Sequence, residues 1–165
     1  MTKIKLKGNE INTAGELPKI GSTAPDFSMV KNDLSEVTLN SIKAKYKILS
    51  IFPSLDTATC ATSVRQFNQR AASLHDTVVL NISKDLPFAQ KRFCGAEGID
   101  RVETFSIFRS DFTKKYPLEI IDGPLKGLCS RAIIVLDANN KVIYTEQVAD
   151  IVSEPNYEAA LKNLA

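Results

Sequence analysis

The chain has 165 residues, which is room for one domain with its own hydrophobic core and too few for two ordinary domains. Its content of 44% hydrophobic and 24% charged residues excludes a fibrous or a disordered chain. The formal net charge of +2 gives no basic surplus for nucleic acid, and no apolar run is long enough to cross a membrane, so we expect neither partner.

The first half of the chain predicts a hairpin, three strands and a helix. Within residues 1–15, apolar and lysine side chains alternate ahead of a Gly-Asn turn, which is typical of a β-hairpin. Short strands are expected at 27–30 and 37–39. The β-rich run at 46–52 predicts a strand buried on both faces. From 57 to 74 the apolar residues recur every three or four positions, as on the buried face of a helix.

The second half predicts a similar alternation. In chain order we expect a buried strand at 76–83, a helix from Pro87 to Gly95 or Gly98, a strand at 102–107, a helical turn at 111–116, a hairpin of 131–137 with 141–148, and a terminal helix from Pro155. This order indicates the α/β class, with a thioredoxin-like mixed sheet flanked by helices and an N-terminal β-hairpin. We expect one domain over residues 1–165, with residues 1–15 as the hairpin extension.

Few side chains carry redox or acid–base chemistry: three cysteines, Cys60, Cys94 and Cys129, and one histidine, His75. A structural zinc site needs four ligands, usually in closely spaced pairs, so we expect no metal, and we expect no cofactor. His75 follows the predicted helix, where we expect it in solvent. The first residues lack the apolar stretch of a signal peptide, so we expect a cytoplasmic protein whose cysteine pairing is transient and catalytic.

Cys60 falls in the first turn of a helix that directly follows a buried strand. The free backbone N–H groups and the positive end of the helix dipole favour an anion there, and a thiolate is an anion. The alternative is a small buried hydrophobe on the same helix stripe as Val64 and Phe67. The position alone leaves both interpretations open.

Three sequence blocks resemble one family. Residues 53–60, Pro-Ser-Leu-Asp-Thr-Ala-Thr-Cys, match the P-x-x-x-T-x-x-C pattern of the peroxiredoxins, and residues 54–68 resemble the active-site loop of their thiol peroxidase subgroup. Residues 83–94 resemble the block that carries the subgroup's resolving cysteine, and residues 130–137 resemble the strand that carries the family's active-site arginine. The similarity runs over essentially the whole chain.

The resemblance implies a thioredoxin-dependent thiol peroxidase of the atypical two-cysteine type, acting in antioxidant defence. Cys60 would reduce hydrogen peroxide or alkyl and lipid hydroperoxides and become a sulfenic acid, which Cys94 would resolve as an intramolecular disulfide. Arg131 would stabilise the thiolate and polarise the peroxide, the Thr57 hydroxyl would contact either of them, and Pro53 would shield the sulfur. Thioredoxin would be the reductant, and the protein would be a homodimer.

Two other functions compete with this one. A redox sensor would pass the disulfide of Cys60 to a client protein, with turnover only incidental. A plain thiol–disulfide oxidoreductase is disfavoured because Thr57 stands where a Cys-x-x-Cys motif would need its first cysteine.

Two further expectations concern Cys129 and the surroundings of the active-site loop. Cys129 alternates with Arg131, which puts it on the same strand face and near the site, and we expect an inert buried thiol there. Apolar residues near the active-site loop are compatible with a bulky organic peroxide, without ranking the substrates: Leu55, Phe93 and Leu118.

Overall fold

The computed structural model describes residues 1–164 and contains a seven-stranded sheet and a separate two-stranded hairpin. The strands are β1 (Thr2–Leu6), β2 (Asn9–Thr13), β3 (Ser28–Val30), β4 (Glu36–Thr38), β5 (Tyr46–Ile51), β6 (Thr77–Ser83), β7 (Glu103–Ser106), β8 (Ala132–Leu136) and β9 (Val142–Gln147). The helices are α1 (Ala58–Arg70), α2 (Pro87–Glu97), α3 (Phe112–Lys115) and α4 (Tyr157–Leu161), with short 3-10 turns at Leu39–Ser41 and Ala71–Ser73. No helix among these residues is both long and apolar enough to span a membrane.

The large sheet is mixed, with the strand order β4-β3-β7-β6-β5-β8-β9. The three strands β5, β6 and β7 run parallel, and β8 pairs antiparallel with β5. In that antiparallel pairing Ile51 lies opposite Ala132, so the residue after Ile51 and the residue before Ala132 leave the sheet at the same end. Arg131 therefore arrives beside the start of the loop that leads from β5 into α1.

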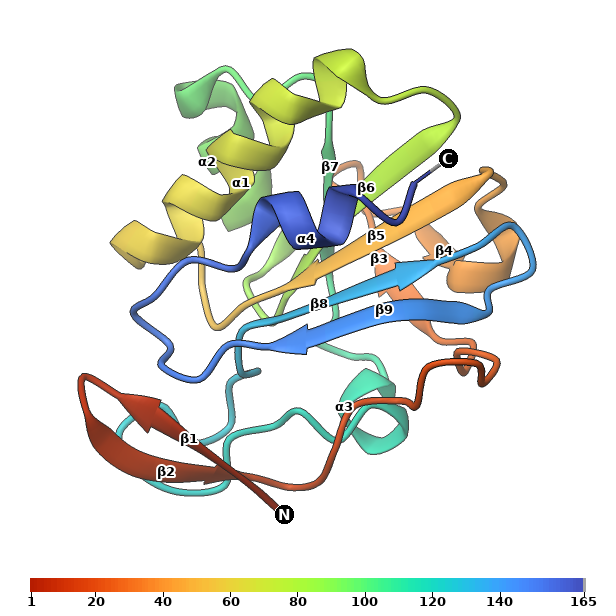
Figure 1. The fold of residues 1–165 in the computed structure, drawn as a ribbon. Helices are drawn as coiled ribbons and strands as arrows, with labels where there is room; N and C mark the ends of the chain where they lie inside the picture. Colours follow the sequence, from red (N-terminus) through yellow and green to blue (C-terminus); the bar gives the residue numbers. More distant parts are fainter. Residues whose placement is uncertain (165) are drawn as a thin grey trace.

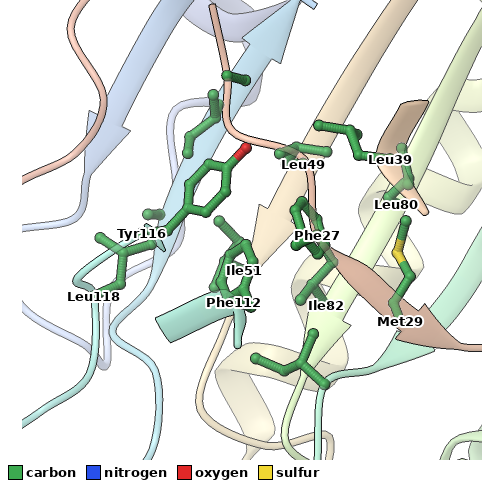
Figure 2. Close-up of a cluster of buried hydrophobic side chains, with 14 of the residues drawn as sticks. Phe27, Met29, Leu39, Leu49, Ile51, Leu80, Ile82, Phe112, Tyr116 and Leu118 are labelled. Carbon is green, nitrogen blue, oxygen red and sulfur yellow. The ribbon is translucent and has the colours of Figure 1, made fainter. Parts of the chain in front are cut away.

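Helices α1, α2 and α4 cover one face of the sheet, and α3 lies on the other (Figure 1). Under α1 and α4, buried apolar side chains form a cluster that includes Cys60, Val64, Phe67 and Tyr157. On the opposite face, the rings of Phe27, Phe112 and Tyr116 pack together over sheet residues such as Leu49 and Ile51 (Figure 2).

The N-terminal hairpin has a small core of its own. Ile4 and Ile11 are opposite each other in the β1–β2 register and pack on Ile120 and Ile151. The hairpin is therefore attached to the segments before β8 and after β9, at the end of the sheet from which α1 begins.

The predicted fold class is confirmed, and the ends of two helices differ from those expected. Helix α1 ends at Arg70, because the chain continues as a 3-10 turn through Ser73. Of the two stops predicted for α2, the structure has the later one: Gly98 caps the helix after Glu97, since it takes the left-handed conformation (φ 64°) that suits a glycine cap. The last helix begins after Pro155, at Tyr157, because the Asn156 side chain accepts from the backbone N–H of Ala159 and caps it.

Candidate active site

Local structure at the start of α1 fixes the orientation of Cys60. Thr57 is the N-cap residue, and its side-chain oxygen accepts from the backbone N–H of Cys60 at 3.3 Å. The same hydroxyl donates to the carbonyl oxygen of Ser54 at 3.2 Å, which holds the loop ahead of the helix. Cys60 is fully buried in the first turn of α1, where the positive end of the helix dipole lies.

Arg131 supplies a buried cation to the same sulfur. Its side chain is 1% exposed, and Nη2 lies 3.2 Å from Cys60 Sγ. Nε and Nη2 also donate to the carbonyl oxygen of Ile151, at 3.1 and 2.9 Å. Among residues 1–164, no carboxylate forms an ion pair with Arg131. Because the Ile151 carbonyl is neutral, Cys60 Sγ is the contacting atom at which a negative charge would lie directly against the guanidinium.

A cavity of about 600 Å³ opens on this site. Thr57 and Arg131, which both contact Cys60, line its inner part. Its other walls come mainly from apolar side chains of the N-terminal hairpin and of the loops around 124 and 151: Leu6, Ile11, Pro124, Leu125, Ile151 and Val152. In the part of the chain that is described, Arg131 Nη1 is buried without a hydrogen-bond partner, so an N–H donor remains for a small polar group.

The apolar wall differs from the one expected. Leu55 and Phe93 pack in the cluster under α1, and Leu118 packs in the cluster on the opposite face. None of the three is among the lining residues. The sequence placed them near the loop by chain position, whereas the hairpin reaches the cavity only through the tertiary fold.

Cys94 lies on α2 and does not contact Cys60. Its half-buried Sγ lies 3.5 Å from the hydroxyl oxygen of Thr104 on β7. Thr104, the contact of Cys94, lies on β7, and Arg131, the contact of Cys60, directly precedes β8. Because β6 and β5 separate β7 from β8, these two contact residues are roughly 14 Å apart at about 4.8 Å per strand spacing. All three cysteines are free thiols in this structure.

Pro53 is buried at the start of the active-site loop, two residues after the end of β5. A residue that sequence reasoning missed holds this loop. The Asp85 carboxylate accepts from the Ser54 hydroxyl at 2.7 Å and from the Leu55 backbone N–H at 2.8 Å. Asp85 stands inside the resemblance block 83–94, which was the only signal for it.

Cys129 is separated from the site, contrary to expectation. It belongs to the cluster on the face opposite Cys60, because β8 begins only at Ala132 and strand alternation does not extend back to residue 129. Burial raises the pKa of the Cys129 thiol to about 12, which makes it inert at neutral pH. His75 is exposed after the 3-10 turn that follows α1. Within residues 1–164, no group of three or more histidine, cysteine or acidic side chains is arranged to hold a metal ion.

A mixed sheet with a buried cysteine at a helix start and a guanidinium on its sulfur defines a thiol-based redox protein of the thioredoxin-like class. The redoxin family model matches residues 19–161. Thiol peroxidases of Mycobacterium bovis and Mycobacterium tuberculosis are each 54% identical over 164 residues, which is 99% of this chain and 99% of theirs.

Solved structures agree with the sequence matches. A peroxiredoxin-like protein from Aquifex aeolicus superposes with a TM-score of 0.93 at 37% identity, covering 99% of this chain and 95% of that one. Thiol peroxidase from Chromobacterium violaceum superposes with a TM-score of 0.90 at 25% identity, covering 98% and 94%. The chain therefore belongs to the redoxin family, as a thiol peroxidase of the peroxiredoxin type. It is an enzyme that reduces a peroxide with electrons from thiols.

Proposed function

We propose that this thiol peroxidase works as a single domain over residues 1–165, in which Cys60 attacks the peroxide and Cys94 resolves the product. The observation that carries the first assignment is the 3.2 Å contact between Arg131 Nη2 and Cys60 Sγ in a buried site. A fixed cation in contact with the sulfur stabilises the negative charge that Cys60 carries when it acts as a nucleophile.

In the first step, the Cys60 thiolate attacks one oxygen of the peroxide and the O–O bond breaks. The sulfur becomes a sulfenic acid, and the other oxygen leaves with a proton as water or an alcohol. Arg131 Nη1, which has no partner within residues 1–164, supplies an N–H to the oxygen that gains negative charge. The Thr57 hydroxyl lines the same cavity and contacts the substrate, and buried Pro53 shields the sulfur from water.

The apolar cavity supports a broad substrate range. Hydrogen peroxide needs only the polar inner end at Thr57 and Arg131, whereas an alkyl or lipid hydroperoxide also buries its chain against the apolar wall. Both kinds of peroxide are therefore substrates, and the organic ones gain binding free energy from the hairpin.

In the second step, the Cys94 thiol attacks the sulfenic sulfur, a disulfide forms and water leaves. The two cysteine Cα atoms must come within about 7 Å, so α2 has to open first. The last turn of α2 supports such an opening, because its residues 95–98 are exposed and two of them are glycines.

A dithiol protein of the thioredoxin type then reduces the disulfide, and the peroxidase acts in the cytoplasm.

The functional unit is a homodimer. Leu86 and Phe88 at the start of α2 and Phe108 after β7 are 50%, 66% and 45% exposed, and their segments are joined by the hydrogen bond from Ser106 Oγ to the Asp85 carbonyl. Such an apolar patch is covered by a second copy in the dimer.

Three variants test the assignment. Cys60→Ser abolishes peroxide reduction. Cys94→Ser allows one oxidation but no recycling by thioredoxin, thioredoxin reductase and NADPH. Cys129→Ala, the matched control, keeps full turnover.

Peptide mapping after one equivalent of peroxide identifies the disulfide: a Cys60–Cys94 peptide is expected, and a Cys60–Cys129 peptide overturns the resolving role of Cys94. Insulin reduction or a trapped mixed disulfide with one client would instead support an oxidoreductase or a sensor.

A further inference from the structure

The segment 149–152, which follows β9, lies between the N-terminal hairpin and the active site. On the hairpin side, Lys5 of β1 forms two backbone hydrogen bonds with it: Lys5 N–H to the Ala149 carbonyl at 2.8 Å, and Ile151 N–H to the Lys5 carbonyl at 2.9 Å. On the active-site side, the Ile151 carbonyl accepts twice from Arg131. One backbone segment therefore connects β1 to the guanidinium.

Asp150 fastens this segment to the hairpin turn. Its carboxylate accepts from the backbone N–H groups of Lys7 at 3.1 Å, Gly8 at 2.9 Å and Val152 at 3.2 Å. These bonds, above all the one from Gly8, lower the pKa of Asp150, so the carboxylate stays ionised at neutral pH. Three N–H donors on one carboxylate fix the segment on both sides of Ile151.

The neighbouring carbonyl is also held at the site. The Thr59 hydroxyl in the first turn of α1 donates to the Val152 carbonyl at 3.0 Å. The Ile151 carbonyl thus binds Arg131, which contacts Cys60, and the Val152 carbonyl binds α1, the helix that contains Cys60. A shift of the segment would move the guanidinium relative to the sulfur.

We propose that Asp150 is a positioning residue for the reaction at Cys60. It holds the Ile151 carbonyl in the position from which that carbonyl orients Arg131 toward the sulfur. The N-terminal hairpin therefore lines the cavity and also supports the position of Arg131. The inference rests on the proposed roles of Cys60 and Arg131 and adds to them a residue that touches neither substrate nor sulfur.

The chain offers a matched control in Asp122. Its carboxylate binds the other strand of the same hairpin, accepting from Asn12 N at 2.8 Å and from Asn12 Nδ2 at 2.7 Å. Asp122 is joined neither to Ile151 nor to Arg131 by any of these bonds. Asp150→Ala and Asp122→Ala each remove a carboxylate that fastens the hairpin, and only the first lies on the path to the guanidinium.

The test measures the reactivity of Cys60 in a Cys94→Ser background, where Cys129 is buried and unreactive. The rates are those of alkylation by iodoacetamide and of one oxidation by hydrogen peroxide, two reagents too small to need the apolar wall. We expect Asp150→Ala to lower both rates about tenfold, as for a misplaced reacting group. Asp122→Ala stays within about twofold, and Asp150→Asn, whose amide oxygen still accepts, recovers part of the loss.

A double-mutant cycle with Arg131→Ala shows whether the effect passes through the guanidinium. Asp150→Ala should cause no further loss in the Arg131→Ala protein. Equal losses with and without Arg131, or equal effects of Asp150→Ala and Asp122→Ala, overturn the inference and leave the proposed function intact. If Arg131→Ala itself leaves both rates unchanged, the proposed role of Arg131 fails and this inference fails with it. Near-UV circular dichroism checks folding, and Asp150→Asn carries the test if Asp150→Ala is unfolded.

Discussion

Cys94 Sγ lies 3.5 Å from Thr104 Oγ1, and in this contact the cysteine thiol is the donor. A threonine hydroxyl has a single proton, and Thr104 donates it to Asn32 Oδ1 at 2.9 Å. The Thr104 oxygen can then only accept from Cys94. In the folded form of α2, Cys94, the proposed resolving cysteine, is therefore held at Thr104 and away from Cys60.

Replacing this acceptor should release Cys94. A Thr104→Val variant keeps the shape of the side chain and removes the hydroxyl, which contacts both Cys94 and Asn32. Loss of the contact with Cys94, at a net contribution of about 1 kcal/mol, corresponds to roughly fivefold in an opening equilibrium. We expect disulfide formation after one equivalent of peroxide to be faster by about that factor, as measured by stopped flow. Thr145→Val on β9 is the control. An unchanged or slower resolution step would show that Thr104 does not restrain Cys94.

Asp85 joins the loops that precede the two cysteine helices. Besides Ser54 and Leu55 it accepts from the Ser83 hydroxyl at 2.7 Å, so its loss leaves three donors without their acceptor. We expect Asp85→Ala to lower the free energy of unfolding by about 2 kcal/mol and to slow the reaction of Cys60 with peroxide, because the active-site loop is no longer held.

Urea unfolding and the single-turnover peroxide rate measure these two effects. Asp33→Ala is the control, since the Asp33 carboxylate binds only within its own turn, at Ser35. A stability loss without any change in the peroxide rate would assign Asp85 a role in folding alone.

The buried thiol of Cys129 should make the protein less stable at alkaline pH. Its pKa is raised by burial from 9.0 to about 12, so between these values the unfolded chain loses a proton that the folded protein keeps. The stabilising contribution is complete below pH 9 and is lost as the pH rises toward 12. At pH 10 the loss is on the order of 1 kcal/mol relative to pH 7.

Urea unfolding at pH 7 and pH 10 measures this loss by comparing the native sequence with Cys129→Ala. The variant lacks the contribution of this thiol, so its free energy of unfolding should fall less between the two pH values, by on the order of 1 kcal/mol. Equal declines in both proteins would mean that Cys129 ionises in the folded state as readily as in the unfolded chain.

Leu125 should separate large from small substrates. It lines the apolar wall of the cavity and packs on the hairpin core. We expect Leu125→Ser to raise the KM for cumene hydroperoxide about fivefold, through lost apolar contact, and to leave hydrogen peroxide reduction unchanged. Leu34→Ser, at a 51% exposed position outside the cavity, is the control. Equal effects of Leu125→Ser on the two peroxides would show that the apolar cavity wall does not bind the organic substrate.

Local sequence was sufficient wherever the interactions are local. The N-terminal hairpin, the buried strands β5 and β6 and the helix that begins after Thr57 were predicted from periodicity and turn residues, and the cap by Thr57 involves residues only three apart. The block resemblance also pointed to Arg131, 71 residues away from Cys60 in the chain. The failures were of another kind: Cys129 was assigned to the wrong face, and the apolar wall was assigned to the wrong residues.

The pattern of residues in the chain thus determined the elements and the family of this protein, and it supplied the proposal for its reactive cysteines. Only the tertiary structure decided which carbonyl orients Arg131, which hydroxyl holds Cys94 and which strand pair closes the cavity. The physical reason is that a backbone carbonyl has no side-chain signature, and that contacts between segments such as β1 and Ile151 depend on how the sheet and its extension pack in three dimensions.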